Sequence, residues 1–252
     1  MRVIVTRPAA QAASWVQALS ERGIQAVALP LIGIAPPQDP SAVAQAWREL
    51  PRRRLVVFVS PNAAEQFFAQ GTPGSTWPSG TIAGSIGPGT TQTLQRLGVP
   101  IAAIVEPAAD APQFDSEALW QRLRQQPWSD ASVLIVRGDG GRDWLADTLR
   151  AHGAQVDFVA AYRRMAPRLD GEALRTLADA LARPRQHLWF FSSSEAIDHL
   201  IQARPGAVWA DSQALATHPR IAKRARDCGF QAVHETRPGL DAVVACIQSL
   251  AS

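Results

Sequence analysis

Short hydroxyl, glycine and proline residues follow six apolar segments of the sequence, and each group stands where a helical pattern begins. The groups are Thr6-Arg7-Pro8, Ser60-Pro61-Asn62, Gly87-Pro88-Gly89-Thr90, Arg137-Gly138-Asp139-Gly140-Gly141, Ser192-Ser193-Ser194 and Thr217-His218-Pro219-Arg220. Ser, Thr and Asn cap the first N–H groups of a helix, and Pro fits its first turn. Helix N-termini also bind anions, because their N–H groups and the helix dipole favour negative charge. Each group alone is explained by capping, but six together favour an anion-binding site.

Arginine supplies nearly all of the positive charge, and Arg7, Arg137 and Arg220 stand in three of the six groups. Arginine holds a carboxylate or a phosphate through two parallel hydrogen bonds, although a GC-rich genome would enrich arginine as well. The net charge of +3 is small, and the sequence has no basic run or basic-aromatic stripe. We therefore expect no nucleic acid partner and favour a small polyanion.

Residues suited to proton transfer, metal binding or covalent catalysis are scarce. The five histidines lack the spacing of metal ligands. Neither a Gly-x-Ser-x-Gly elbow nor a Gly-Lys-Ser/Thr phosphate loop occurs, and Gly87-Pro88-Gly89 lacks the third glycine of a dinucleotide site. Tyr162, the only tyrosine, is either a half-buried aromatic with a wet hydroxyl or a functional group. We expect no metal and no cofactor.

Ten short apolar runs alternate with helical patterns along the chain. The runs are Val3–Val5, Ala26–Leu29, Leu55–Val59, Ile82–Ile86, Ile101–Val105, Val133–Val136, Val156–Ala160, Leu188–Phe191, Ala214–Ala216 and Ala232–His234. Continuous apolar strands between helices are typical of parallel sheets that are covered on both faces. We predict an α/β protein with two flavodoxin-like, doubly wound parallel sheets of five strands each. Ligands bind beyond the carboxyl ends of such strands, where all six groups stand.

Three pairs of segments repeat at nearly constant spacing, which indicates a duplication. Residues 3–7 match 133–137 at 130 positions, 57–60 match 189–192 at 132, and 97–99 match 228–230 at 131. The copies are circularly permuted, because the second begins near residue 187, reaches the C-terminus and resumes at Met1.

The permutation predicts how the chain divides into domains. Residues 1–34 and 169–252 would form domain 1, and residues 38–162 would form domain 2. The connectors 30–37 and 163–168 would form a two-stranded hinge that opens and closes a cleft between the domains.

The chain starts with an apolar run directly after Met1 and has no signal-peptide pattern. No run of 18 apolar residues occurs, so no membrane span is expected. Cys228 and Cys246 fall in helical patterns and are expected as free, buried thiols. These features favour a cytoplasmic protein without a membrane partner.

Taken in order, the motifs resemble the uroporphyrinogen-III synthase family over essentially the whole chain. The residues that carry the resemblance are Val5-Thr6-Arg7-Pro8, Phe58-Val59-Ser60-Pro61-Asn62-Ala63, Ile86-Gly87-Pro88-Gly89-Thr90, Asp115-Ser116-Glu117, Tyr162-Arg163, Phe190-Phe191-Ser192-Ser193-Ser194, Pro219-Arg220 and Gly229-Phe230. The resemblance implies the same interrupted two-domain architecture. It also implies cyclisation of hydroxymethylbilane, a linear tetrapyrrole with eight carboxylates, to uroporphyrinogen III in haem and sirohaem biosynthesis. Ring D would be inverted and water lost, without a cofactor.

The resemblance also assigns roles to single residues. Tyr162 would help the hydroxyl of the bilane to leave, and Ser60, Thr90, Ser192 and Gln213 would contact the substrate. The six groups supply further substrate-binding candidates, which are Arg7, Asn62, Arg137, Gly138, Ser194, Thr217, His218 and Arg220. Many relatives carry Ile-Gly-Pro-x-Thr where this chain has Thr217-His218-Pro219-Arg220-Ile221, so the glycine is His218 and the last hydroxyl is missing at Ile221.

Two other classes of protein stay open. A non-catalytic, synthase-like module would bind a tetrapyrrole or another polyanion, and a solute binder of the periplasmic type would have the same hinge but needs a signal peptide. As an enzyme, the chain is expected to be a monomer that acts on a small-molecule tetrapyrrole and contacts the preceding enzyme of the pathway transiently.

Overall fold

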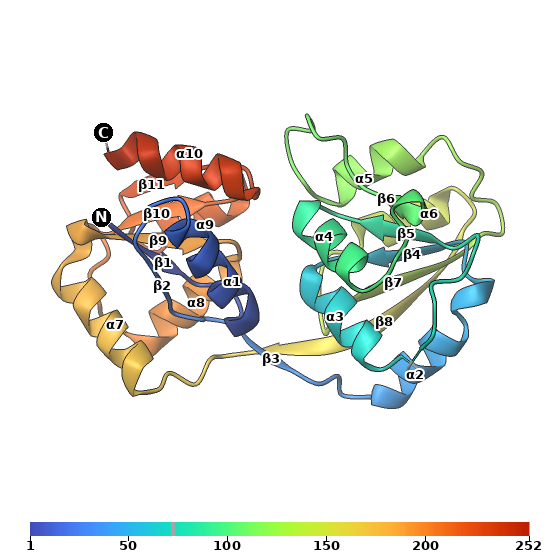
Figure 1. Cartoon of the computed structure of the whole chain (residues 1–252), viewed down its shortest axis with the longest axis horizontal. Coiled ribbons are helices and arrows are strands. Elements are labelled where there is room, and N and C mark those ends of the chain that lie inside the picture. The colour runs from blue at the N-terminus through green and yellow to red at the C-terminus, as the bar shows by residue number, and fades with distance from the viewer. Residues whose placement is uncertain (72–73, 252) are drawn as a thin grey trace. The chain divides into compact units, whose positions relative to one another are not determined.

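The structure is a computed structural model that describes residues 1–71 and 74–251. The chain divides into two compact units, Met1–Gly33 with Met165–Ser252 (unit 1) and Ile34–Arg164 (unit 2). Each unit has one sheet with helices around it (Figure 1). The chain enters unit 2 once and returns once, so unit 1 is discontinuous in sequence.

Unit 1 contains a five-stranded sheet in the order β11-β10-β9-β1-β2, in which the paired strands are parallel. Its strands are β1 (Arg2–Val5), β2 (Ala26–Ala28), β9 (His187–Phe191), β10 (Gln213–Ala216) and β11 (Ala232–Glu235). Its helices are α1 (Ala9–Ser20), α7 (Gly171–Ala182), the 3-10 turn η3 (Pro184–Gln186), α8 (Ser194–Ala203), α9 (Pro219–Asp227) and α10 (Leu240–Ala251). Counted from β1 along the chain, the strand order reads 2-1-3-4-5, which is the flavodoxin-like order.

The second sheet has six strands in the order β3-β8-β7-β4-β5-β6, and the pairs from β8 to β6 are parallel. Its strands are β3 (Gly33–Ala35), β4 (Leu55–Phe58), β5 (Ile82–Ser85), β6 (Ile104–Val105), β7 (Ser132–Gly138) and β8 (Gln155–Met165). The helices of unit 2 are α2 (Pro40–Arg48), η1 (Leu50–Arg52), α3 (Pro61–Ala69), α4 (Pro88–Arg96), η2 (Ile101–Ala103), α5 (Ser116–Leu123) and α6 (Trp144–Ala151). Counting β7 and β8 first, and then β4, β5 and β6, gives the order 2-1-3-4-5 here as well.

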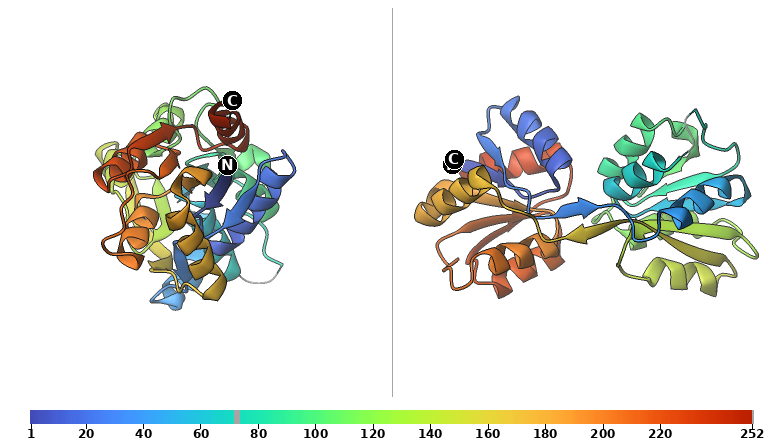
Figure 2. Two further views of the ribbon diagram at one scale, coloured as in Figure 1. Left: turned by 90° about the vertical axis from the view of Figure 1, so that its left-hand side faces the viewer. Right: turned by 90° about the horizontal axis from the view of Figure 1, so that it is seen from below.

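Helices cover both faces of each sheet (Figure 2). In unit 2, Val56 and Phe58 pack with α2, α3 and α4, whereas Leu55 and Val57 pack with α5 and α6. Side chains alternate between the faces of a strand, so a strand that is buried on both faces is apolar throughout. This is why the strands of the sequence read as continuous apolar runs.

The sheet of unit 1 follows the same rule. Val3 and Val5 pack with α1 and α10 on one face. On the other face, Trp189 and Phe191 of β9 contact an aromatic cluster that includes Phe230, three residues after the end of α9. The predicted α/β class with parallel sheets is confirmed.

Two predictions about strands are wrong in detail. The segment around Gly33–Ala35 was expected to be a connector, but it pairs beside β8 and extends the second sheet to six strands. Prolines on both sides of this short segment hide its pairing in the sequence. The run Ile101–Val105 is a strand only at Ile104–Val105, because residues 101–103 form a 3-10 turn that leaves Ile101 73% exposed.

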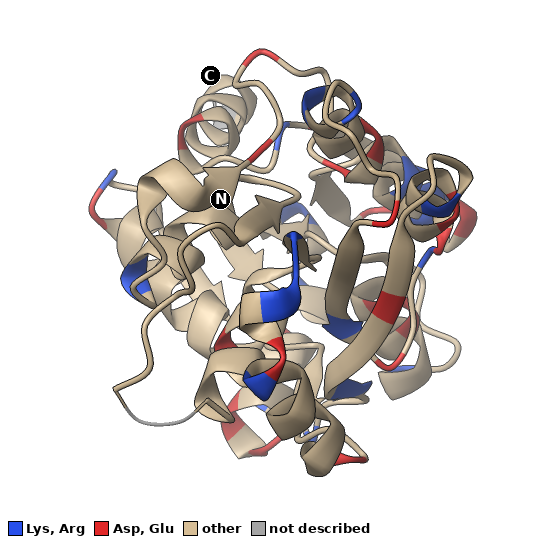
Figure 3. Ribbon diagram, turned by 90° about the vertical axis from the view of Figure 1, so that its right-hand side faces the viewer, with Lys and Arg blue, Asp and Glu red and all other residues tan. Residues whose placement is uncertain are grey.

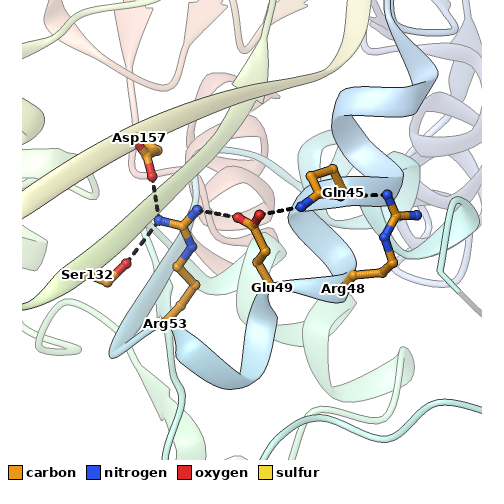
Figure 4. Close-up of polar contacts among 6 residues, drawn as sticks. All are labelled: Gln45, Arg48, Glu49, Arg53, Ser132 and Asp157. Carbon is orange, nitrogen blue, oxygen red and sulfur yellow. Dashed lines mark hydrogen bonds and ion pairs between the residues drawn. The ribbon is translucent and has the colours of Figure 1, made fainter.

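A cluster of polar side chains fastens η1 and α2 to the sheet of unit 2 (Figure 4). Arg53 donates to Ser132 Oγ (2.9 Å), to Asp157 Oδ2 (2.5 Å) and to Glu49 Oε2 (3.0 Å). The side chain of Gln45 also donates to Glu49. This bond, together with the charge and hydrogen bond of Arg53, holds the pKa of Glu49 below its usual value. Ser132 begins β7, so the cluster lies away from the carboxyl ends of the strands.

Among the described residues, no helix combines the length and the apolar character that a membrane span needs. Cys228 ends α9 and Cys246 lies in α10, and both are free thiols. They are half-buried rather than buried, and burial still raises the pKa of each.

Candidate functional site

Tyr162 lies on β8 at the carboxyl edge of the second sheet and is fully buried, although a half-buried residue was one expectation. The register of β7 and β8 shifts between Arg137 and Gly138, so that Gly138 pairs with Tyr162. A Cβ atom at Gly138 would lie 3.1 Å from Cζ and 3.4 Å from Oη of Tyr162. Glycine at this position therefore makes room for the phenol ring.

Ser60 and Arg164 both contact the Tyr162 hydroxyl. Ser60 follows β4 and caps α3, where its Oγ accepts the Ala63 N–H at 3.1 Å. The same Oγ lies 3.1 Å from Tyr162 Oη. Arg164 donates from Nη2 to Tyr162 Oη at 3.3 Å. The structure thus brings two hydroxyl groups and one guanidinium together at the ends of β4 and β8.

The neighbouring loop of unit 2 begins α4. Gly87 holds the N-cap position without a side chain, and Thr90 and Thr91 both donate their N–H groups to the Gly87 carbonyl. The Thr90 side chain is buried in the first turn. Asn62, in the first turn of α3, is half-buried. Because glycine has no side chain, the N-cap residue of α4 supplies no side-chain acceptor for the first N–H groups of the helix.

Arg137 differs from the expectation for this loop. The sequence placed Arg137 and Gly138 in a loop before a helix, but β7 extends through both and α6 starts only at Trp144. Arg137 is paired with Asp143 at 2.5 Å, and its Cζ lies 3.9 Å from the centroid of the Phe158 ring. Its charge is already neutralised within unit 2. Pairs of opposite charge recur there, as the interspersed basic and acidic segments of Figure 3 illustrate.

In unit 1, Arg7 follows β1 and packs against aromatic rings. Its Cζ lies 4.6 Å from the centroid of Trp15 and 5.6 Å from that of Phe190. Nη1 donates to Gln11 Oε1 at 3.4 Å, whereas the buried Nε has no hydrogen-bond partner among residues 1–71 and 74–251. Burial lowers the pKa of Arg7 to about 10, so the guanidinium is still charged at neutral pH.

The N-termini of α8 and α9 are each capped by the side chain of the N-cap residue. Ser193 Oγ accepts the Glu195 N–H at 3.2 Å, with Ser192 before the cap and Ser194 in the first turn. His218 Nδ1 accepts the Arg220 N–H at 3.1 Å, which requires this nitrogen to be unprotonated. Both serine neighbours are half-buried, and Arg220 is exposed.

Thr217 and Gln213 lie at opposite ends of β10. Thr217 is buried after the carboxyl end, where its N–H donates to the Phe191 carbonyl at 3.2 Å. Gln213 is the first residue of β10, and its Nε2 lies 3.5 Å from the Arg185 carbonyl. Ligands of such sheets bind at the carboxyl ends. The structure therefore does not bring Gln213 together with the other candidates of unit 1.

Two residues that sequence reasoning missed are Arg164 and Trp15. Residues two apart in a strand share a face, so Arg164 could have been placed beside Tyr162. The contact of Trp15 with Arg7 crosses two turns of α1 and needs the strand end to be placed first. The spacing of Arg164 from Tyr162 and that of Trp15 from Arg7 occur often in sequences, so neither identifies a site residue unless the fold is known.

The fold and the site together define the class of protein. It is an α/β protein of two parallel-sheet units, with hydroxyl and arginine side chains at the strand ends. Solved structures share this fold over the whole chain. A mutant uroporphyrinogen III synthase from the extremely thermophilic bacterium Thermus thermophilus matches with a TM-score of 0.60 at 16% identity, covering 100% of this chain and 97% of that one. A uroporphyrinogen-III synthetase from Helicobacter pylori 26695 matches with a TM-score of 0.60 at 15% identity, covering 99% and 100%.

The sequence comparisons give the family. A model of the family described as "Uroporphyrinogen-III synthase HemD" matches residues 13–245. The uroporphyrinogen-III synthases of Salmonella typhimurium and Escherichia coli are each 30% identical to this chain, over 92% of it and 93% of their own lengths. The chain belongs to the uroporphyrinogen-III synthase family. The predicted resemblance and the predicted enzyme class are thereby confirmed.

Proposed function

We propose that the chain cyclises hydroxymethylbilane to uroporphyrinogen III, and that the carboxyl edge of the sheet in unit 2 carries the chemistry. Family membership supports the reaction. The observation that supports its location is the pair of hydroxyl groups Ser60 Oγ and Tyr162 Oη, 3.1 Å apart at the ends of β4 and β8.

Such a site suits a reaction that needs little acid or base. The bilane loses its hydroxyl to give an azafulvene, passes through a spiro-pyrrolenine and closes with ring D inverted. The oxygen leaves with the electron pair of its bond to carbon, so hydrogen-bond donors at that oxygen lower the barrier. The bilane cyclises without enzyme to the uninverted isomer, so the larger contribution of the protein is to hold the chain in the productive geometry.

Carboxylate binding is assigned to Arg7 in unit 1. Its guanidinium is charged, stacked on Trp15 and already partly desolvated, and no carboxylate of the described residues pairs with it. A charged group in this state gains more from an anion than a fully hydrated one, because part of its desolvation has already taken place. Arg137 is a weaker candidate, since Asp143 already neutralises it.

The helix ends and hydroxyls of unit 1 are proposed as further contacts. Ser192, Ser194 and Thr217 stand at the carboxyl ends of β9 and β10, where a polyanion could accept hydrogen bonds from them. His218 fills the end of α9 through its own ring, so we propose it as a positioning group for that turn.

We also propose that the units are copies of one another in circularly permuted order. The shared 2-1-3-4-5 strand order supports this, as do matching strand starts. Leu55 and His187 begin β4 and β9 132 positions apart, and Ile82 and Gln213 begin β5 and β10 131 positions apart. These spacings are close to those of the sequence repeat.

Incubation of the purified protein with hydroxymethylbilane, followed by separation of the uroporphyrin isomers, tests the proposed function. Isomer III should form in excess, at a rate proportional to the protein concentration. If isomer I alone forms, at the rate of the protein-free reaction, while the protein still binds uroporphyrinogen, the chain is a binding module and not an enzyme.

A further inference from the structure

The burial of Tyr162 decides which hydroxyl a substrate can meet first. Tyr162 is 0% exposed, whereas its partner Ser60 is half-buried. Gly138 lies directly against the phenol ring and adds to its enclosure. A molecule at the carboxyl edge of the sheet would therefore contact Ser60 before it could contact Tyr162.

The chemistry of the three groups fixes the direction of their hydrogen bonds. A guanidinium only donates, so Tyr162 Oη accepts from Arg164. In the part of the chain that the structure describes, Ser60 Oγ is the acceptor within reach of the buried phenol hydrogen. Ser60 Oγ thus accepts from Tyr162 and also from the Ala63 N–H. Its own hydrogen is used by neither bond and can be donated outward.

We propose that Ser60 is the catalytic residue that donates to the departing hydroxyl, and that Tyr162 and Arg164 are positioning residues that orient its hydrogen. This inference rests on the proposed function. It differs from a direct role of Tyr162 because the phenol acts only through Ser60.

The proton balance of the step is complete. The C–O bond of the hydroxymethyl group breaks with both electrons on oxygen, and the Ser60 proton joins that oxygen to release water. The phenol proton of Tyr162 moves to Ser60, and the resulting phenolate lies 3.3 Å from the Arg164 guanidinium, which stabilises it. Solvent takes up the pyrrole N–H proton that the azafulvene loses, and Ser60 returns a proton to Tyr162 while it accepts one from solvent.

A double-mutant cycle of Arg164 and Tyr162 tests the chain of contacts. Tyr162→Phe should lower kcat about tenfold to a hundredfold, which is the range for a positioned acid at the lower end of its usual effect. Arg164→Met should lower kcat about tenfold and leave KM unchanged, and the double variant should be no slower than Tyr162→Phe, since residues that act in one network are not additive. Arg164→Lys keeps a cationic donor and should recover part of kcat.

Arg163→Met is the matched control. Arg163 is the exposed neighbour of Arg164, and its Nε donates to the Pro36 carbonyl at 3.3 Å, so this variant should keep the kcat of the wild type. Multiplying effects in the Arg164 and Tyr162 double variant, or a rise in KM with unchanged kcat in Arg164→Met, would overturn the proposal. A wild-type protein that makes no excess of isomer III would instead refute the proposed function.

Serine variants test the outward donor. Ser60→Ala should lower kcat at least as much as Tyr162→Phe, while Ser60→Thr keeps both the hydroxyl and the helix cap and should retain most of it. Thermal unfolding of each variant separates loss of the α3 cap from loss of catalysis. A folded Ser60→Ala protein that is faster than Tyr162→Phe would show that the phenol reaches the substrate without Ser60.

Discussion

Ser60 and Ser192 occupy matching places after the central strands of the two units, but their surroundings differ. Ser60 caps α3 and lies 3.1 Å from the Tyr162 hydroxyl. In unit 1 the cap of α8 is Ser193, and the residue 130 positions before Tyr162 is Ile32, which is buried. A hydroxyl pair therefore lies at the end of the central strand in unit 2, whereas in unit 1 the residue that corresponds to Tyr162 by this spacing is apolar.

The two units also differ in how their arginines are paired and how the N-termini of their helices are capped. Arg137 in unit 2 is neutralised by Asp143, whereas Arg7 in unit 1 is stacked on Trp15 and has no carboxylate partner among the described residues. The end of α9 is filled by His218, but Gly87 leaves α4 without a side-chain cap. Two units with the same strand order are thus proposed to have different roles, which are proton donation in unit 2 and carboxylate binding in unit 1.

Among the variants that leave Ser60 in place, Tyr162→Phe is expected to have the largest effect on the chemistry of unit 2. We expect kcat to fall about tenfold to a hundredfold because Ser60 loses the hydrogen bond that orients its hydrogen toward the leaving oxygen. The product should stay isomer III, since the remaining contacts still impose the geometry. If Tyr162→Phe keeps full activity, the Tyr162 hydroxyl does not contribute to catalysis. If the variant loses both activity and thermal stability, Tyr162 acts through packing instead.

Arg7→Ala tests carboxylate binding in unit 1. We expect affinity for uroporphyrinogen to fall by about 1.5–3 kcal/mol, because Arg7 is half-buried and charged, and to depend less on salt than in the wild type. Arg220→Ala is the comparison. This arginine is exposed, so its loss should cost well under about 1 kcal/mol. Titrations of both variants at two salt concentrations decide the point, and equal affinities throughout would favour capping over anion binding.

Gly138→Ala tests the packing that positions the phenol. The added Cβ would lie 3.1 Å from Tyr162 Cζ, so the ring must shift and its bond to Ser60 should weaken. We expect kcat to fall severalfold and the free energy of unfolding to fall by about 1–3 kcal/mol. Gly140→Ala is the control, because nothing lies within 4 Å of a Cβ there. Similar rates for the two variants would remove Gly138 from the account.

The smallest effect on activity is expected from Arg53→Met, which removes the polar cluster at the other end of the sheet of unit 2. The free energy of unfolding at pH 7 should fall by about 1–2 kcal/mol, because Arg53 is largely buried and bonded to Ser132, Asp157 and Glu49. Arg48→Met, which removes an exposed side chain bonded to Gln45, should cost less than about 0.5 kcal/mol.

The pH dependence of the same cluster has a defined sign. The pKa of Glu49 is lowered in the folded state, first by Gln45 and then by Arg53. Its contribution to stability is therefore present above the unfolded value of about 4.3 and is lost as pH falls through the lower folded value. Urea unfolding of wild type and Arg53→Met from pH 7 to pH 3 should show that the difference between their free energies of unfolding shrinks as Glu49 is protonated. A constant difference would contradict the role of Glu49.

The sheets could be predicted because their strands are buried on both faces. Leu55–Phe58 and His187–Phe191 are apolar throughout, apart from the first residue of the second strand, and this pattern is typical of a parallel, covered sheet. β3 was missed because the five residues between Pro30 and Pro36, of which Gly33–Ala35 form the strand, were interpreted as a connector on account of the prolines. The end of β7 was misplaced because Arg137 ends the apolar run and Gly138 is a poor strand former, and their pairing with β8 depends on a register shift that no local pattern shows.

The site was predictable as a set of strand ends but not as a set of contacts. Ser60 and Tyr162 are 102 positions apart, and their contact depends on β8 running past the ends of its neighbours. The family resemblance assigned Gln213 a substrate contact, yet it is the first residue of β10, at the opposite end of the strand from Thr217. The pairing of Arg137 with Asp143 could not be foreseen either, because it depends on how the loop before α6 folds.

The most direct test of the central claim compares Ser60→Ala with Ser192→Ala in one steady-state assay with hydroxymethylbilane. The claim is that unit 2 supplies the proton donor and that unit 1 contributes binding. We predict that Ser60→Ala lowers kcat at least about tenfold with little change in KM, whereas Ser192→Ala raises KM and leaves kcat near the wild-type value. A loss of kcat in Ser192→Ala as large as that in Ser60→Ala would contradict the division of tasks between the two units.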